Sequence, residues 1–556
     1  MRHRQQTIRD YHEATKHRFR RHAPGPGYLD WDNRPALFRH HAGAELLSLS
    51  VPRPWPADRE PDLATACAAA AVPVHDLDAA GISELLYHSL AISSWRRAGE
   101  TLWSVRCTPS SGNLHPTEAY LLGGPLPGLL DAPAVLHYDA RVHGLEVRAT
   151  PGAELFAGLR ESLGGEGVLA GLSTVPWRQA WKYGERGLRY CHLDAGHALA
   201  ALALAAARLG WGARLLEEAS SAELAALLGL IDTGPAEPEL PVALLALGPT
   251  VAPAPAAAPV WQPLDIAGWE GLDWRGRPSR LSREVRPWPL LAGAAAALDK
   301  PATPGIYGDE AARAPSPDDP PLGEALPAGP LLRGRRSATG FDPAGKLSEN
   351  AFYDLMATTL PASASVPWSL LAWEPRVDLL VFVHRVDGLR PGLYGLVRSP
   401  GGEEKLRADL RRDYIWQRPA GCPAHLPFYR LSPGDQQPVA RILSCVQDLA
   451  SDGAFTVAML ADFDGSLARH GSWFYARLHW ECGVIGQMLY LGAEALGLGG
   501  CGLGCFFDDA VHETVGLNTG TRADRQTLYH FAVGAPVVNR RIQALPAYPP
   551  PEGTEI

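Results

Sequence analysis

An arginine-rich segment, residues 333–337, is the first part of this chain that could carry chemistry. A guanidinium group donates two parallel hydrogen bonds to a phosphate, and a neighbouring hydroxyl can add another. A second basic pair stands near the C-terminus, at residues 540–541. A basic run alone is usually a solvated patch, but two runs that meet would predict an anion site. The candidate ligands of that anion are Arg333, Arg335, Arg336, Ser337, Arg540 and Arg541.

A tight turn in the first half of the chain offers hydroxyls, an amide and backbone N–H groups that a glycine makes approachable. From these residues alone, an ordinary turn is an equally good interpretation. The candidate binding residues of this turn are Pro109, Ser110, Ser111, Gly112 and Asn113.

Lys182 and Tyr183 stand side by side before a long Ala/Leu-rich segment. Such a pair can take up and donate protons if burial and a neighbouring cation lower the pKa values of both groups. They are the candidate catalytic residues, although a Lys-Tyr dipeptide by itself is weak evidence.

Residues 497–502 satisfy the GxGxxG spacing, but they follow a predicted helix, whereas a dinucleotide fingerprint follows a strand and opens a helix. We therefore expect a loop whose backbone approaches a planar ligand, with Gly502, Leu503 and Gly504 as binding residues. His192 and His197 have no partners at metal spacing, and Cys501 and Cys505 are not spaced as a redox or zinc pair, so no metal site is predicted.

The chain repeats itself. Residues 194–197 and the apolar run after them align with residues 481–484, and the offset, 481 − 194 = 287, still holds for Gly229 against Gly516. The repetition predicts a fused tandem of two related domains. Helical periodicity from Ile82 and buried strands such as 377–383 predict an α+β fold in each, with helices on a mixed sheet. We expect an N-terminal arm lying on the surface over 1–60, domains over 61–250 and 331–556, and a Pro/Ala-rich connector over 251–330.

Each repeat lacks what the other keeps. The first has Ala68–Ala71 where the arginine segment should fall, and Pro253–Pro255 where the C-terminal bases should fall. The second has a turn at 361–365 without the glycine and asparagine, and Arg469-His470 at 182 + 287 = 469 in place of Lys-Tyr. The pattern predicts one complete site made from both halves.

Composition excludes several classes of protein. The net charge of −9 gives no basic footprint for nucleic acid. No stretch has the roughly 18–20 apolar residues that a membrane helix needs, and the start lacks a signal-peptide core, so we expect a cytoplasmic protein that binds neither nucleic acid nor membrane.

These segments together resemble the FMN-dependent nitroreductase superfamily, over roughly residues 80–250 and 330–541. Within it they are most similar to the azoline dehydrogenases of the SagB/ThcOx-type branch. Members are dimers with two FMN sites. In each site the arginines of one subunit bind the FMN, and the Pro-Ser-Ser turn of the other subunit covers it. The resemblance implies that the two domains form an intramolecular pseudo-dimer, so that a monomeric chain could be the complete protein. It also implies about one FMN per chain and a degenerate second site. It also implies that the backbone of 502–504 contacts the flavin and that Lys182 and Tyr183 face the substrate.

The leading hypothesis is an FMN oxidoreductase that dehydrogenates an azoline-type heterocycle in a peptide or small molecule. An NAD(P)H-dependent reductase of nitro compounds, quinones or enones is the enzyme alternative. The third hypothesis is a flavin-free pseudoenzyme that binds a peptide or protein partner through the same cleft. Single-domain azoline dehydrogenases act with a cyclodehydratase, and no feature of this chain indicates such a partner.

Overall fold

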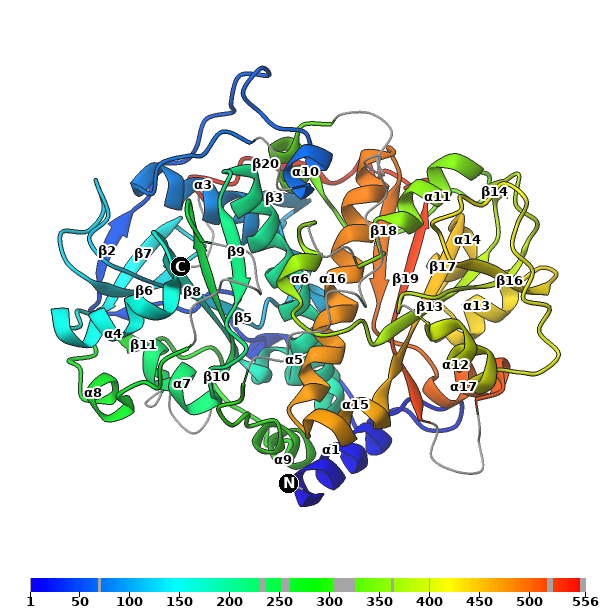
Figure 1. The fold of residues 1–556 in the computed structure, drawn as a ribbon, viewed down its shortest axis with the longest axis horizontal. Helices are drawn as coiled ribbons and strands as arrows, with labels where there is room; N and C mark the ends of the chain where they lie inside the picture. The colour runs from blue at the N-terminus through cyan, green and yellow to red at the C-terminus, as the bar shows by residue number, and fades with distance from the viewer. Residues whose placement is uncertain are drawn as a thin grey trace.

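The computed structural model in Figure 1 shows two sheet-containing lobes on either side of a central helix pair. It describes residues 2–68, 72–230, 237–251, 261–304, 326–361, 365–399, 401–517 and 524–550. Three sequence predictions fall wholly or partly outside these residues. They concern the alanines at 69–71, the prolines at 253 and 255, and residues 362–364 of the second turn.

The first lobe is built on a seven-stranded sheet. All its pairings are antiparallel, where a mixed sheet was expected. In spatial order the strands are β2 (Glu45–Ser48), β7 (Gly144–Ala149), β6 (Ala134–Asp139), β5 (Thr117–Gly123), β8 (Val168–Thr174), β10 (Leu240–Gly248) and β9 (Gly212–Leu215). Its helices include α3 (Ala79–Ser89), α4 (Ala153–Leu163), α5 (Pro176–Tyr183), α6 (Gly187–Arg208) and α7 (Ser221–Leu228).

The second lobe has a six-stranded sheet that is also antiparallel in all its pairings. Its strands are β16 (Phe428–Pro433), β15 (Gly392–Leu396), β13 (Val377–Val383), β17 (Phe455–Asp462), β19 (Arg525–Gly534) and β18 (Gly499–Leu503). The helices are α11 (Glu349–Ala357), α12 (Gly402–Asp409), α13 (Gln437–Leu443), α14 (Leu449–Asp452), α15 (Phe463–His470), α16 (Phe474–Ala495) and α17 (Asp508–Val515). Two α+β domains in tandem are thus present.

The repeat offset is visible in the structure. Adding 287 to both ends of α6 gives 474 and 495, the ends of α16, and adding it to the start of β9 gives 499, the start of β18. Gly229 and Gly516 both end a helix in the left-handed conformation, with φ of 63° and 76°. The two copies therefore keep both their helix lengths and their stop signals.

The paired helices α6 and α16 pack against each other between the lobes (Figure 1). They cross at Gly196 and Gly483, which are also 287 residues apart. A Cβ atom on Gly196 would lie 2.3 Å from the carbonyl oxygen of Trp480, and one on Gly483 would lie 2.4 Å from that of Leu193. Only glycine permits this approach, so the crossing marks the pseudo-twofold relation between the domains.

The N-terminal segment differs from the surface arm that its sequence suggested. Residues Arg2–Ala14 form helix α1, and Ile8 and Tyr11 are buried in the main core. The helix packs against α9 (Pro289–Ala297) of the connector, whose described part also contains α8 (Ile266–Glu270). A few apolar residues are therefore enough to dock this helix, because Ile8 and Tyr11 pack into a core that other elements form.

The C-terminal segment crosses from the second domain to the first. Strand β20 (Gln543–Leu545) pairs with β3 (Ile92–Ala98), which pairs in turn with β4 (Thr101–Arg106). Beyond it, the hydroxyl of Tyr548 donates to the carbonyl of Ala140. Within the described residues, no helix is long and apolar enough to cross a membrane.

Candidate active site

A cavity of about 670 Å³ lies between the two domains, within the size range of small-molecule sites. The first domain lines it with the turn at 108–113, with β3 and β4, and with Asp194 and His197 of α6. The second lines it with residues 335–339 after helix α10 (Ala328–Gly334), with α16, and with Gly499, Cys501 and Gly502 of β18. One space is therefore enclosed by segments that lie far apart in the sequence.

Arg335 is buried against the first domain. Its Nε donates to the carbonyl of Cys107 at 2.8 Å and its Nη2 to that of Arg106 at 3.1 Å, while its guanidinium lies 4.9 Å above the ring of Tyr490. Its Nη1 is buried without a hydrogen-bond partner. A buried donor without a partner costs about 1–3 kcal/mol, so a ligand acceptor would relieve this cost.

Arg336 stands beside Arg335, and the carboxylate of Glu494, which lines the same cavity, acts electrostatically on both. Its Nη1 donates to the carbonyls of Arg333 and Arg335 at 2.7 and 2.6 Å, and its Nε is buried and unpaired. Burial, with repulsion from Arg335, lowers the pKa of Arg336 to about 10. In the described part of the chain neither arginine forms a salt bridge with Glu494 or another acid, so a bound anion could still accept charge-assisted hydrogen bonds from them.

The other predicted anion ligands lie in different places. Ser337 lines the cavity and shares a hydrogen bond of 2.8 Å with the hydroxyl of Tyr490. Arg333 turns away from it: its guanidinium stacks on Tyr87 at 3.5 Å and donates to the carbonyls of Tyr87 and Ile92. Arg540 and Arg541 are exposed and outside the lining, which includes residues 537–539 and 542 instead.

The turn at 108–113 is held by a residue that the sequence analysis did not select. Asp194, on α6, accepts hydrogen bonds from Ser110 Oγ at 2.6 Å, from the backbone N and Oγ of Ser111 at 3.1 and 3.2 Å, and from Gln179 Nε2 at 2.9 Å. Burial raises the pKa of Asp194 to about 7 against these hydrogen bonds. Its signal was a carboxylate in a helix that the Ala/Leu-rich sequence predicts to be buried, because buried carboxylates are rare without partners.

Lys182 and Tyr183 reach the same turn from the end of α5. A Cβ atom placed on Gly112 would lie 2.8 Å from the Tyr183 hydroxyl and 3.3 Å from Lys182 Nζ, so both polar ends border this glycine of the cavity wall. Burial and the nearby Arg34 lower the pKa of Lys182. Burial instead raises the pKa of Tyr183 well above its usual value, contrary to the lowering that proton exchange by both groups would require.

The glycine-rich segment is a strand, β18, where a loop was expected. Gly502 lines the cavity, and its N–H donates to the hydroxyl of Tyr490 at 3.0 Å. The side chain of Leu503 is buried in the second domain's core, and the carbonyl of Gly504 accepts from Tyr190 Oη at 3.1 Å. Of the three predicted residues only Gly502 lines the cavity, together with Tyr490, a residue outside the predicted motifs.

His192 and His197, the two histidines without partners at metal spacing, are both buried. His197 lines the cavity, its Nδ1 is 3.2 Å from Gln487 Oε1, and burial lowers its pKa to about 3. His192 is also buried, and Trp480 Nε1 donates to its Nδ1 at 3.4 Å. Both are neutral at physiological pH.

The matching place in the pseudo-symmetric half is filled by protein. A 3₁₀ turn, Trp368–Leu370, packs on β9, the counterpart of β18, and the Val366 N–H donates to the carbonyl of Cys67 at 2.7 Å. Glu481, at the position of Asp194, accepts from the backbone of Arg376 and from Arg398. The small cavity that Pro361 and Glu481 line, of about 10 Å³, has its own counterpart of about 20 Å³ beside Pro109 and Asp194, so it is the packing of Trp368–Leu370 on β9 that distinguishes the two halves.

The nitroreductase family profile matches this chain twice, over residues 77–248 and 332–535, and the chain belongs to that family. Among solved structures, it is similar to a protein of Anabaena variabilis that bears the name nitroreductase, with 21% identity, a TM-score of 0.67, and coverage of 96% of this chain and 99% of the other. This similarity shows the tandem fold.

Two less extensive similarities concern single segments. One is to the Escherichia coli microcin synthetase complex McbBCD, solved with a truncated pro-MccB17 bound (22% identity, TM-score 0.25, 31% of this chain, 64% of the other). Another is to an FMN-dependent nitroreductase of Clostridium difficile (10% identity, TM-score 0.21, 38% and 88%). No curated protein sequence matches the chain.

Proposed function

We propose that this nitroreductase-family oxidoreductase holds one FMN in the 670 Å³ cavity and dehydrogenates an azoline-type heterocycle carried by a peptide or small molecule. The observation that carries the FMN assignment is the pair Arg335 and Arg336, two adjacent guanidinium groups that line the cavity without any salt bridge among the described residues. A phosphate group would supply the missing charge and the missing acceptors.

The cofactor fits the residues that are present. Arg336 and the unpaired Nη1 of Arg335 would hold its phosphate, with Ser337 nearby, and the glycines at 112 and 502 would let a planar ring approach the backbone. Opposite the arginines, Asp194 fixes the turn that forms the other wall. When bound, FMN supplies the acceptor for the hydride that leaves the substrate.

The protein's own contribution to the chemistry is proton transfer. Dehydrogenation of an azoline removes one hydride and one proton from adjacent ring atoms. Lys182, whose pKa burial lowers, would take the proton at Nζ. Tyr183 stays protonated and would donate a hydrogen bond from its hydroxyl to the substrate.

The first test is the flavin content of the purified chain, measured from its visible absorbance and from the cofactor released on denaturation. We expect about one FMN per chain. About two would overturn the single composite site, and none after reconstitution would favour the flavin-free pseudoenzyme.

The second test is turnover. A thiazoline-bearing peptide should lose two hydrogen atoms, which mass spectrometry detects as a decrease of about 2 Da, and oxygen should be consumed at the same rate. If the FMN-loaded protein instead leaves the thiazoline unchanged and oxidises NADPH with a nitroarene or quinone, the reductase alternative is correct.

A further inference from the structure

A cluster of sulfur and imidazole groups lies outside the proposed active site, where the N-terminal segment meets the second domain. A ring nitrogen of His17, one of His22 and the Sγ of Cys505 all lie within 4.8 Å of one another. The thiol of Cys445 lies within hydrogen-bonding reach of Cys505. All but His22, which is exposed, are partly buried, so small reagents can reach the cluster.

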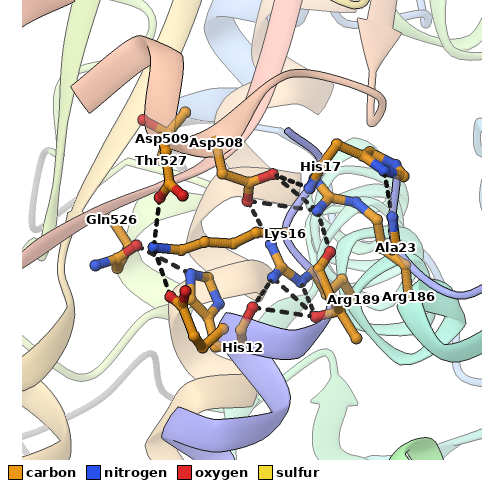
Figure 2. A network of polar contacts seen from close by, with 12 residues as sticks. His12, Lys16, His17, Ala23, Arg186, Arg189, Asp508, Asp509, Gln526 and Thr527 are labelled. Atoms are coloured by element: carbon orange, nitrogen blue, oxygen red, sulfur yellow. Dashed lines mark hydrogen bonds and ion pairs between the residues drawn. The ribbon is translucent and has the colours of Figure 1, made fainter. Parts of the chain in front are cut away.

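The N-terminal segment is fixed at this point by several contacts. The N–H of His17 donates to Asp508 Oδ2 at 2.9 Å, and Lys16 Nζ is 2.9 Å from Asp509 Oδ1. Arg186 and Arg189, on or next to α6, pair with Asp508 as well, as Figure 2 shows. The imidazole of His17 is therefore held beside residue 505 by backbone and side-chain anchors, not by chance contact.

The proton on His17 has a defined place. The N–H of Ala23 donates to His17 Nδ1 at 2.9 Å (Figure 2), so the neutral ring carries its proton on Nε2. Burial lowers the pKa of His17, which keeps the ring neutral, and its side chain hydrogen-bonds Cys505. An imidazole N–H that faces a sulfur stabilises a thiolate there.

The thiol of Cys445 also favours a thiolate at Cys505. Hydrogen bonding from Cys445 lowers the pKa of Cys505 against the opposing effect of burial, and His17 and Arg186 lower it further. The two loops are tied together, since the N–H of Phe507 donates to the carbonyl of Leu443 at 2.8 Å and Gln447 Nε2 to that of Cys505 at 3.0 Å. Cys501 lies nearby, on β18, but differs from Cys505 because burial raises the pKa of Cys501 to about 12.

We propose that Cys505 is a reactive thiolate with Cys445 as its resolving thiol, and that a hydroperoxide converts the pair into a disulfide. The Cys505 sulfur attacks the peroxide, the O–O bond breaks, and the leaving oxygen takes a proton, which gives a sulfenic acid. The Cys445 sulfur then attacks the sulfenic sulfur, the S–S bond forms and water leaves. The thiols lose two electrons and two protons, and hydrogen peroxide becomes two waters.

A metal ion is the competing interpretation of these ligands, since imidazole and thiolate both bind zinc. A histidine that binds a metal usually donates its other ring N–H, whereas His17 Nδ1 accepts the Ala23 N–H. The hydrogen bonding of His17 thus favours the thiolate. Neither interpretation requires FMN, and because Cys501 lines the cavity proposed for FMN, the reactivities of the cysteines are compared on the flavin-free chain.

The test treats the reduced full-length chain with a small excess of hydrogen peroxide and maps its cysteines by mass spectrometry. We expect a Cys445–Cys505 disulfide, with Cys501 still reduced as the internal control. In Cys445→Ser, dimedone should trap a sulfenic acid at Cys505. A disulfide-free product in which Cys501 oxidises as fast as Cys505 would overturn the proposal.

Alkylation gives a second readout that does not need the disulfide to form. With iodoacetamide near pH 6.5, Cys505 should react at least about tenfold faster than Cys501, because thiolate is the reacting species. His17→Ala should slow Cys505, while His3→Ala, an exposed histidine of α1, should not. Equal rates at the two cysteines would refute the thiolate. So would a stoichiometric zinc ion whose removal by a chelator is needed before either cysteine reacts.

Discussion

The two faces of the α6–α16 pair began as copies and now differ in what they hold. On one face, the 108–113 turn and residues 335–339 enclose about 670 Å³. On the other, Trp368–Leu370 lies against β9, and the N–H of Val366 donates to the carbonyl of Cys67. Fusion relaxes the symmetry that a homodimer imposes, because each half can change without changing the other. One site could therefore be filled while the other was kept open.

The helix positions 194 and 481 show the same divergence at one residue. Asp194 binds a turn whose residues line the open cavity, whereas Glu481 accepts from the backbone of Arg376 and Val377 and pairs with Arg398. A carboxylate is kept in both because each buried one has donors to satisfy it. Only the first domain's carboxylate, Asp194, thereby fixes a wall of the open cavity.

Lys182→Met should have the largest effect on the function of the open face. The second repeat has Arg469 at this position, so no other lysine replaces its function. We expect FMN content to stay unchanged and the turnover of a thiazoline peptide to fall by roughly 10²–10⁴-fold, the usual contribution of a general base. Single-turnover flavin reduction measures this directly. Unchanged rates would remove Lys182 from the chemistry.

Trp368→Ala tests whether the filled face can be reopened. Removing this buried ring should cost about 3–5 kcal/mol in the free energy of unfolding, measured by urea denaturation. The flavin ratio should remain about one, because the first repeat has alanines at 68–71 where the second has arginines. Binding of a second FMN would show that bulk alone closed that face.

Arg336→Ala should weaken FMN binding at the open face, because it removes a charge-assisted contact worth about 1.5–3 kcal/mol. The Kd for FMN should therefore rise roughly 10–150-fold. Arg540→Ala is the matched control, since Arg540 is exposed and outside the cavity lining. Fluorescence titration of the apoprotein with FMN measures both. If the two variants lose equal affinity, the C-terminal bases reach the phosphate after all.

Asp194→Asn should give the smallest of these effects, about 1–3 kcal/mol of stability, because Asn presents N–H groups toward several donors. Since the folded pKa is raised to about 7, the stability linked to this proton is present below the pKa of the unfolded chain and is lost as pH rises through 7. The gap between the wild type and the variant should therefore shrink from pH 5 to pH 8. A gap that is independent of pH would contradict the raised pKa.

The sequence by itself determined the tandem, since the offset of 287 sets the ends of α6 and α16 and the glycines that stop α7 and α17. It also determined which segments meet, because a motif lost in one repeat and kept in the other leaves one complementary set. Strand 377–383 was predictable from β-branched and apolar residues alone. These are local or periodic properties that a linear pattern records.

Only the tertiary structure decided which members of each motif face the cavity. Arg333 turns to Tyr87 while Arg335 and Arg336 remain beside the cavity, although all three lie within four residues. Asp194, Tyr490 and the docking of α1 emerged in the same way, from tertiary contacts between residues 83, 12 and up to 463 positions apart. Side-chain direction and the pKa values of Lys182 and Tyr183 depend on burial by distant elements, and burial is a property of the folded chain that no local pattern encodes.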